Sequence, residues 1–328
     1  MDYEQLATRV IEGHQTTREE AIGVAAAPDA DLLAVLNAAF RVRTRFHGNA
    51  VKVHVLQNAK SGVCPEDCKF CSQSLKYNRA KDVPQYGMQP VEELVDGARR
   101  AVEMGAVTYC MVTATRGPTG REIETVSQAA RRIKDEHPGL RLCASLGLLA
   151  EGQAEALRAA GVDRYNHNLE TSPNHFPNIV STHGIEDRVR TVRWAKNAGL
   201  EACCGGILGL GESVSDWVDL AMSLRELEVE SIPLNFLDPR PNTPLADAER
   251  LDPKACLMAL AMFRLVNPQA DLRVAGGREV VLRSMQPLAL YAANSIFTNG
   301  YLTTPGAQPS DDMRMIREAG FVAQVMSA

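Results

Sequence analysis

The sequence predicts an α/β fold, a complete (β/α)8 barrel of the TIM type with an N-terminal helical extension. Short apolar runs rich in β-branched residues alternate eight times along the chain with longer amphipathic segments. This alternation favours a parallel barrel, because crossovers of one hand place each strand beside the last and close the sheet on itself. Such barrels take about 250 residues, which leaves roughly the first 45 of the 328 residues for helices ahead of the barrel.

The first expected strand, residues 50–59, alternates Val51, Val53 and Val55 with polar residues at the strand period. The seven later strands are expected at 107–115, 140–149, 164–171, 200–210, 231–239, 271–279 and 295–303.

The segments between these strands have the pattern of amphipathic helices. Residues 90–106 and 213–227 place apolar side chains on one face, and a further helical segment, 29–48, precedes the barrel. Several helices run into a glycine that suits a helix C-cap, and these glycines are Gly105, Gly161 and Gly199. We expect a single domain over 1–328, with helices to about residue 45, the barrel at about 46–305 and a C-terminal helix and tail at about 306–328.

Composition narrows the class of protein. With 45% hydrophobic and 23% charged residues and a net charge of −5, the chain has enough apolar side chains for a large core. An apolar run of about eighteen residues, as a membrane span needs, is not found in the sequence, and the N-terminus is too polar for a secretory signal. We therefore expect a cytoplasmic protein that does not bind membranes. The slightly acidic balance argues against nucleic acid as the main partner.

Three cysteines stand close together in the stretch SGVCPEDCKFCSQS, residues 61–74, directly after the first expected strand. They are Cys64, Cys68 and Cys71. Active sites of parallel barrels gather at the C-terminal ends of the strands, so we expect this loop at the active-site mouth. Three thiolates match three irons of a cubane cluster, whose fourth iron is left for a cofactor or substrate. The alternative is a structural zinc site completed by a distant residue such as His54 or His167.

Polar side chains occupy one face of the expected strand 164–171. They are Asn166, Asn168 and Glu170. Barrel interiors usually hold branched aliphatic residues, and buried amides cost free energy unless they are hydrogen-bonded. The opposite face carries Tyr165 and Leu169. The polar face is therefore expected to line a barrel interior that binds a ligand.

A second group of cysteines lies outside the loop, at similar positions on the second, third and fifth expected strands. It comprises Cys110, Cys143 and Cys203. A single cysteine of this kind is most often a small buried hydrophobe, but thiols at matching heights of one barrel can converge. Cys204 points away from Cys203, and Cys256 lies on an apolar helix, so we expect both to pack in the core.

The ordered set of motifs resembles the biotin synthase family of the radical S-adenosylmethionine superfamily. The Cys-x-x-x-Cys-x-x-Cys loop with Phe70 before its last cysteine resembles the superfamily signature. The segments YNHNLETS, GGILGLGE, PLNFLDPRPNTPL, RVAGGRE and AANSIF…YLTTP then resemble the family in order, over most of the chain. The resemblance implies a sulfurtransferase that converts dethiobiotin to biotin by inserting sulfur between two unactivated carbons.

The resemblance also implies the cofactors and partners. A 4Fe-4S cluster on the loop cysteines binds and reductively cleaves S-adenosylmethionine to give a 5′-deoxyadenosyl radical. A 2Fe-2S cluster is held by Cys110, Cys143, Cys203 and an arginine, here Arg273, and supplies the sulfur. A low-potential electron donor such as flavodoxin or ferredoxin, and a homodimer, are implied as well.

By the same resemblance, individual residues have expected contacts. The residues implied at S-adenosylmethionine are Phe70, Glu170, Arg188, Gly205 and Gly206. The residues implied at dethiobiotin are Asn166, Asn168, Asn235, Thr303 and Thr304. Many family members have Asp at the position of Glu170. Without the resemblance, Arg188 would be interpreted as a solvated helix arginine, and Arg273 as the partner of a carboxylate such as Glu279 or Asp238.

Two other functions stay open from the sequence. Another radical S-adenosylmethionine barrel, such as a maturase or a methyl-rearranging enzyme, keeps the loop but need not have the three strand cysteines and Arg273. A non-catalytic iron-sulfur electron carrier has no use for a complete barrel with a polar interior.

Overall fold

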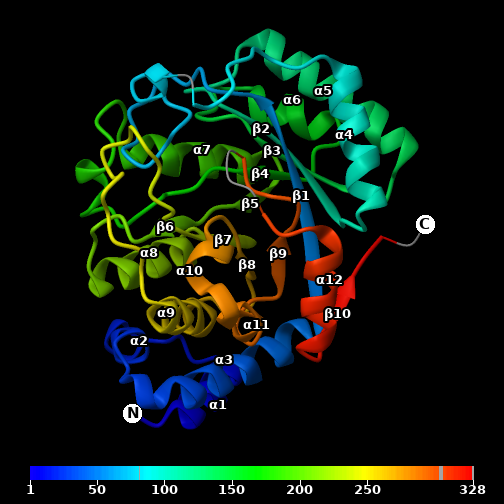
Figure 1. Ribbon diagram of the computed structural model, residues 1–328. Coiled ribbons are helices and arrows are strands. Elements are labelled where there is room, and N and C mark those ends of the chain that lie inside the picture. The colour runs from blue at the N-terminus through cyan, green and yellow to red at the C-terminus, as the bar shows by residue number, and fades with distance from the viewer. Residues whose placement is uncertain (81, 303–305, 327–328) are drawn as a thin grey trace.

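The computed structural model describes residues 1–80, 82–302 and 306–326. A closed parallel barrel stands at its centre, and helices surround it (Figure 1). Neighbouring strands pair in the order of the chain, and β9 returns to pair with β1 through Lys52 and Ser295, which closes the circuit. The predicted fold class is confirmed.

Most strands are shorter than the sequence predicts, because the C-terminal parts of the predicted segments leave the sheet and enter loops. The strands are β1 (Ala50–Lys60), β2 (Thr108–Thr113), β3 (Arg141–Ser145), β4 (Arg164–Asn166), β5 (Glu201–Cys203), β6 (Gly206–Leu208), β7 (Ser231–Phe236), β8 (Asp271–Val274), β9 (Ser295–Phe297) and β10 (Val322–Gln324). Glu170 illustrates the difference, since its φ of 71° takes it out of extended conformation.

The fifth predicted strand, 200–210, is divided into β5 and β6. Both pieces pair with β7, through Cys203 and Ser231 for β5 and through Gly206 and Leu234 for β6. Pro233 lies between these pairs and has no N–H to donate, so the ladder is interrupted there. Gly205 lies directly against Pro233 at this interruption. A larger residue does not fit there, because a Cβ at position 205 would lie 1.9 Å from the Pro233 carbonyl oxygen.

The strand β10 was not predicted. It pairs with Ala50–Lys52 at the start of β1, whereas β2 begins to pair with β1 only at His54. The longer β1 therefore exposes backbone groups beside its first residues, and β10 satisfies them.

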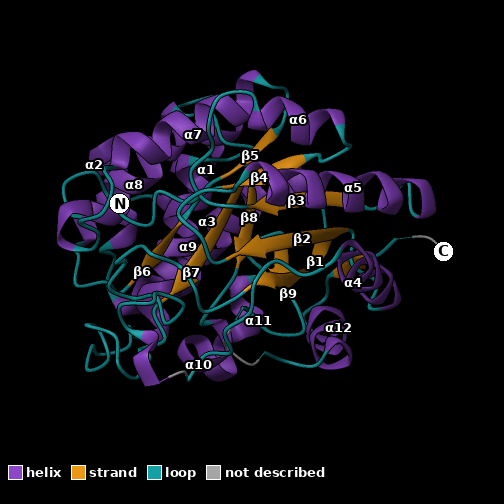
Figure 2. Ribbon diagram, turned by 90° about the horizontal axis from the view of Figure 1, so that it is seen from above, coloured by secondary structure: helices purple, strands orange, loops and turns teal. Residues whose placement is uncertain are grey.

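Helices cover the outer face of the barrel (Figure 2). The helices are α1 (Tyr3–Ile11), α2 (Arg18–Ala25), α3 (Leu32–His47), α4 (Val91–Glu103), α5 (Gly120–Glu136), α6 (Gln153–Ala159), α7 (Ile185–Asn197), α8 (Val214–Glu226), α9 (Pro253–Val266), α10 (Arg278–Leu282), α11 (Gln286–Ala289) and α12 (Pro309–Glu318). The predicted helices 29–48, 90–106 and 213–227 correspond to α3, α4 and α8. Gly105, Gly161 and Gly199 follow helices at φ of 77°, 94° and 80°, as a C-cap glycine does.

The N-terminal helices pack against the barrel rather than standing apart. In Figure 1 they lie together at the end of the molecule where the strands begin, and α2 and α3 both contact α9. Arg43 of α3 donates from Nε to the carbonyl of Ala293 at 3.0 Å and from Nη2 to the carbonyl of Ala50 at 2.9 Å. In the described part of the chain, no single helix is both long enough and apolar enough to cross a membrane. The pair of helical segments Arg18–Ala25 and Asp29–His47, bent by 95° at the break between them, meets the length and composition criteria only when taken together.

Alternation along the strands separates an apolar outer layer from a polar interior. On β2, Tyr109 and Met111 join the apolar cluster beneath α4 and α5, whereas Cys110 lies on the other face and borders a central cavity. Cys204 and Cys256 are fully buried in an apolar cluster, as predicted. The interior of the barrel is therefore available for a ligand site.

Candidate active site

A single cavity at the C-terminal ends of the strands contacts both groups of cysteines. Its walls include all three loop cysteines and all three strand cysteines. The polar face predicted on 164–171 also lines it, through Asn166, Asn168 and Glu170, while Tyr165 and Leu169 pack outside in the core. The expected location of the loop and the expected direction of these side chains are confirmed.

The cysteine loop is held in place by short-range backbone contacts. Cys64 bonds through its N–H to the carbonyl of Gln73 at 3.2 Å and through its carbonyl to the N–H of Leu75 at 2.8 Å. The N–H of Cys71 bonds to the carbonyl of Cys68 at 2.9 Å. Burial raises the pKa of each of these thiols, that of Cys71 to about 12. Each thiol therefore keeps its proton at neutral pH until a metal displaces it.

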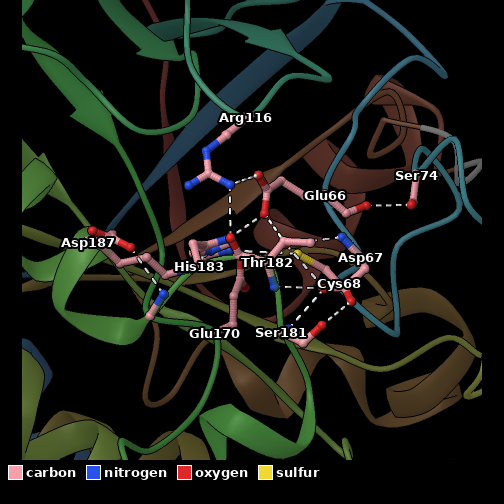
Figure 3. A network of polar contacts seen from close by, with 12 residues as sticks. Glu66, Asp67, Cys68, Ser74, Arg116, Glu170, Ser181, Thr182, His183 and Asp187 are labelled. Atoms are coloured by element: carbon pink, nitrogen blue, oxygen red, sulfur yellow. Dashed lines mark hydrogen bonds and ion pairs between the residues drawn. The ribbon is translucent and has the colours of Figure 1, made fainter.

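The two acidic residues inside the loop tie it to the segment before α7 (Figure 3). Asp67 accepts hydrogen bonds from Ser181, at 2.9 Å from the backbone N–H and 2.5 Å from Oγ. Burial alone would raise the pKa of Asp67, but these bonds lower it overall. Glu66 accepts a bond from Arg116 at 2.9 Å, contacts Thr182, and lies 2.5 Å from Nδ1 of His183. The loop is thus anchored on its outer side by charge-assisted bonds.

Arg188 of α7 faces the cavity rather than solvent. It is 6% exposed, and its Nη1 donates to the carbonyl of Asn168 at 2.8 Å and lies 3.3 Å from Oε1 of Glu170. Its Nη2 is 3.8 Å from Sγ of Cys68. The interpretation of Arg188 as a solvated helix arginine is therefore wrong. The guanidinium carries positive charge to the edge of the cysteine loop.

Glu170, the carboxylate that pairs with Arg188, is largely buried. Burial is the largest influence on its carboxyl group and raises its pKa, against the lowering effect of Arg188. Asn168 donates to Oε2 of Glu170 at 3.4 Å and accepts from the N–H of Gly205 at 3.1 Å. Asn166 donates to the carbonyl of Cys203 at 3.1 Å and accepts from Ser145 at 3.1 Å. These side chains are pre-positioned by hydrogen bonds that leave part of each amide available.

The other residues implied by the resemblance differ in whether they line the cavity. Asn235 lines the cavity, and its amide donates to the carbonyl of Gly206 at 3.0 Å and accepts from the N–H of Gly276 at 2.8 Å. Gly205 and Gly206 are not among the lining residues of the described chain. Instead they lie where the backbones of Pro233 and Glu170 come too close for a Cβ. Phe70 does line the cavity and packs against a small apolar cluster. Thr303 and Thr304 lie outside the described residues.

The strand cysteines meet deep in the same cavity. Cys110 and Cys143 are direct register partners on β2 and β3, and Cys203 pairs with Asn166 on the next strands. The Cys143 thiol is in hydrogen-bond contact with both of the other thiols. The contact with Cys110 and burial raise the pKa of Cys143, against the lowering effect of the contact with Cys203. The predicted convergence of the three thiols is confirmed.

Arg273 of β8 completes the surroundings of these thiols. Its Nη1 lies 3.7 Å from Sγ of Cys203, and its Nη2 donates to Oγ of Ser231 at 3.0 Å and lies 3.4 Å from Nε2 of His54. The two carboxylates considered as partners are engaged elsewhere. Glu279 pairs with Arg278, and Asp238 pairs with Arg240 and Arg250.

Arg164 is one of the residues that line the cavity without having been predicted from the sequence. Arg164, at the start of β4, is the register partner of Cys143, and its side chain is only 6% exposed. Its Nη2 bonds to Glu201 at 2.8 Å, whereas its buried Nη1 has no hydrogen bond to any described residue and lies 3.9 Å from Asp271. The available signal was an arginine at the first position of a strand whose later residues turn into the barrel.

The donor sets fit iron-sulfur clusters. Within the described ranges, no three His, Cys, Asp or Glu side chains surround a single point as ligands of one metal ion do. The thiolates of a cluster bind different irons, so they need not converge in this way. His54 and His167 were the two candidates for the fourth ligand of a zinc site. His54 contacts Arg273 beside the strand cysteines, and His167 lines the shared cavity. Buried Nε of Arg273 and Nη1 of Arg164, unbonded within the described chain, are donors suited to an anionic group.

Comparison with protein families gives two adjacent matches. The radical SAM superfamily matches residues 59–224, and the biotin and thiamin synthesis associated domain matches residues 233–322. The biotin synthase of Salinibacter ruber is 62% identical over 316 residues, covering 96% of this chain and 87% of that protein. The biotin synthase of Geobacillus kaustophilus is 49% identical over 316 residues, covering 96% and 94%.

Solved structures share the same fold at low sequence identity. The crystal structure of methylornithine synthase superposes with a TM-score of 0.83 at 17% identity, covering 97% of each chain. The FeFe-hydrogenase maturase of Carboxydothermus hydrogenoformans superposes with a TM-score of 0.82 at 16% identity, covering 99% of this chain and 80% of that one. At these identities the likeness establishes the barrel architecture alone.

Proposed function

The chain belongs to the biotin synthase family of radical S-adenosylmethionine enzymes, and we propose that it forms biotin from dethiobiotin in the cavity that its two cysteine groups share. The observation that carries this proposal is the common cavity. A radical generated at the loop would have to reach a substrate that also contacts the sulfur source, and one cavity lined by both groups meets this requirement.

Cys64, Cys68 and Cys71 are proposed to hold a 4Fe-4S cluster, and Cys110, Cys143, Cys203 and Arg273 a 2Fe-2S cluster. The first supplies the electron that cleaves S-adenosylmethionine, and the second supplies the sulfur atom. Support for the assignment comes from depth: the strand cysteines are almost fully buried, whereas the loop cysteines are partly exposed at the mouth. An entering cofactor therefore reaches the loop cysteines first.

The chain's own residues then bind and orient the cofactor. Arg188 provides a charged donor for the carboxylate, next to Cys68. Glu170 is proposed to accept from the ribose hydroxyls, and its longer side chain is accommodated by its pairing with Arg188. Phe70 provides an apolar wall. Gly205 and Gly206 contribute indirectly, because they let the strand beside Glu170 approach closely.

The substrate is proposed to lie between the two cysteine groups. Asn166, Asn168 and Asn235 line this part of the cavity and each keeps donor or acceptor capacity beyond the bonds described, which suits a ureido ring with both N–H and C=O groups. Thr303 and Thr304 remain proposed partners of the substrate carboxylate.

Another radical S-adenosylmethionine barrel is the alternative that the fold permits. The strand cysteines argue against it here, because a reaction without sulfur insertion does not need three buried thiols with an arginine beside them. We also propose that the helices and barrel form one domain, that the chain acts as a cytoplasmic homodimer, and that a flavodoxin or ferredoxin supplies electrons.

The deciding experiment is an anaerobic assay of purified, cluster-reconstituted protein with dethiobiotin, S-adenosylmethionine and a low-potential reductant. Biotin and 5′-deoxyadenosine are both measured, and about six irons per chain are expected for the two clusters together. Formation of 5′-deoxyadenosine without biotin, with both clusters present, would contradict the proposal in favour of another radical reaction.

A further inference from the structure

A row of three hydrogen-bonded side chains joins the cysteine loop to the arginine that faces the cofactor cavity. Glu66 stands between two of the loop cysteines, and its Oε2 lies 2.5 Å from Nδ1 of His183 (Figure 3). The opposite ring nitrogen, Nε2, lies 3.0 Å from Nε of Arg188. The role proposed for Arg188 does not by itself require this histidine.

The two contacts together determine which ring nitrogen carries the proton. A guanidinium only donates, so Nε2 of His183 must accept from Arg188, and a carboxylate only accepts, so Nδ1–H must donate to Glu66. The histidine is therefore neutral with its proton on Nδ1. Burial and the charge of Arg188 lower the pKa of His183, in agreement with a neutral ring.

The neutral ring fixes the plane of the guanidinium. His183 holds Nε of Arg188, and the carbonyl of Asn168 holds Nη1 at 2.8 Å. Phe176 packs edge-on against the imidazole at 5.8 Å and lies 5.5 Å from the guanidinium carbon. Held from both sides, Arg188 directs Nη2 towards Cys68 and the cavity.

We propose that His183 is a positioning residue that orients Arg188 for the carboxylate of S-adenosylmethionine and couples this orientation to the cysteine loop through Glu66. The inference rests on the proposed function, because it concerns the same cofactor site. It adds a residue that touches neither cluster nor cofactor, and it gives Glu66 a purpose beyond fastening the loop.

A simpler explanation is that His183 only fastens the loop. Asp67 already does so through Ser181, without any contact with Arg188. If His183 had the same task, only its bond to Glu66 would matter. The two explanations therefore differ in which ring nitrogen is needed.

A matched pair of variants separates the two nitrogens. The side-chain amide of Asn can replace Nδ1–H as a donor to Glu66 but does not reach Arg188, whereas the longer Gln can present its oxygen to Arg188 where Nε2 stood. His183→Asn and His183→Gln are compared with His175→Gln, a control histidine in the same segment that contacts Leu210 and Asn178 instead. Iron content and thermal unfolding verify that each variant carries its cluster and is folded.

The main readout is the dissociation constant for S-adenosylmethionine, measured by anaerobic equilibrium dialysis. The electron paramagnetic resonance of the reduced loop cluster, with and without the cofactor, is the second readout. We expect His183→Asn to weaken binding about tenfold or more and to blunt the cofactor-induced spectral change, since a hydrogen bond to a charged group is lost. His183→Gln should retain most of both, and His175→Gln all of both.

Wild-type affinity in His183→Asn, whether or not His183→Gln is impaired, would overturn the positioning role and leave only the fastening role. Equal loss in both variants with normal iron content would overturn it as well, because the Nε2 contact would then not be the one that matters. If the wild-type protein itself bound no S-adenosylmethionine, the proposed function would fail and the inference with it.

Discussion

The two cysteine groups lie in one cavity but are built in opposite ways. The loop cysteines stand within eight sequence positions, on an irregular segment held by Glu66 and Asp67. The strand cysteines come from β2, β3 and β5, and they meet only because the barrel closes. The loop group is partly exposed, and the strand group is buried.

This difference suggests a division of labour. A cluster at the mouth can receive an electron and an entering cofactor, and its loop can adjust to them. A cluster among rigid strands is protected from solvent and held at a fixed distance from the substrate. Changes to the two groups should therefore fail at different stages of the reaction.

The largest effect is expected at the loop. Replacing Cys64, Cys68 or Cys71 with Ala should abolish 5′-deoxyadenosine formation while the protein remains folded, because each thiolate holds one corner of the proposed 4Fe-4S cluster. Chromatographic detection of 5′-deoxyadenosine after anaerobic incubation measures the effect. Cys256→Ala, at a cysteine of α9 that is buried in the apolar core, is the matched control and should retain cleavage. Cleavage at the wild-type rate in any loop variant would remove that cysteine from the cluster.

The second effect separates the two groups. Replacing Cys110, Cys143 or Cys203 with Ala should leave the 4Fe-4S signal and cofactor cleavage in place and yet give no biotin, because only the sulfur source is lost. Cys204→Ala provides a control one position away, since that thiol points into the apolar core. Biotin formed by a protein shown to lack the second cluster would contradict the assignment of this cluster as the donor.

The sequence predicted the loop more completely than the strand group, for a physical reason. The ligands of the loop are local, so their spacing is visible in a short stretch such as Cys64 to Cys71. The convergence of Cys110 with Cys143 depends on strand register, which alternation along one strand only suggests. That convergence could be proposed only after the barrel itself had been predicted.

Other features could not be predicted from local patterns. The contacts of His183 and Arg116 with Glu66 join residues 50 or more positions apart, and neither residue belongs to a motif. The division of the fifth strand depends on Pro233 in a neighbouring strand, and β10 depends on the extra length of β1. In each case the deciding partner is distant in sequence and near in space.

A smaller effect tests the arginine beside the strand cysteines. Arg273→Met should leave the fold and the loop cluster intact but alter the Mössbauer or optical signature of the proposed 2Fe-2S cluster, because a nitrogen donor beside Cys203 is removed. Mössbauer spectra of the iron-57-enriched variant and wild-type protein make the comparison. An anaerobic crystal structure with Arg273 paired to a carboxylate and far from iron would exclude it as a ligand.

The smallest effect is expected at Arg164, the second arginine of this part of the cavity. Its buried Nη1 has no hydrogen bond within the described chain, and it neighbours Cys143 across the sheet. A positive charge near a cluster favours the reduced, more negative state, so Arg164→Gln should lower the reduction potential of the 2Fe-2S cluster without changing its ligand signature. Arg141→Gln is the matched control, because Arg141 also pairs with Glu201, at 2.7 Å, but is 42% exposed. Anaerobic redox titration followed by visible absorption measures both variants. An unchanged reduction potential in Arg164→Gln would mean that this arginine serves only its ion pair with Glu201. An equal shift of the potential in Arg141→Gln would mean that the shift arises from loss of the pairing with Glu201 rather than from loss of charge beside the cluster.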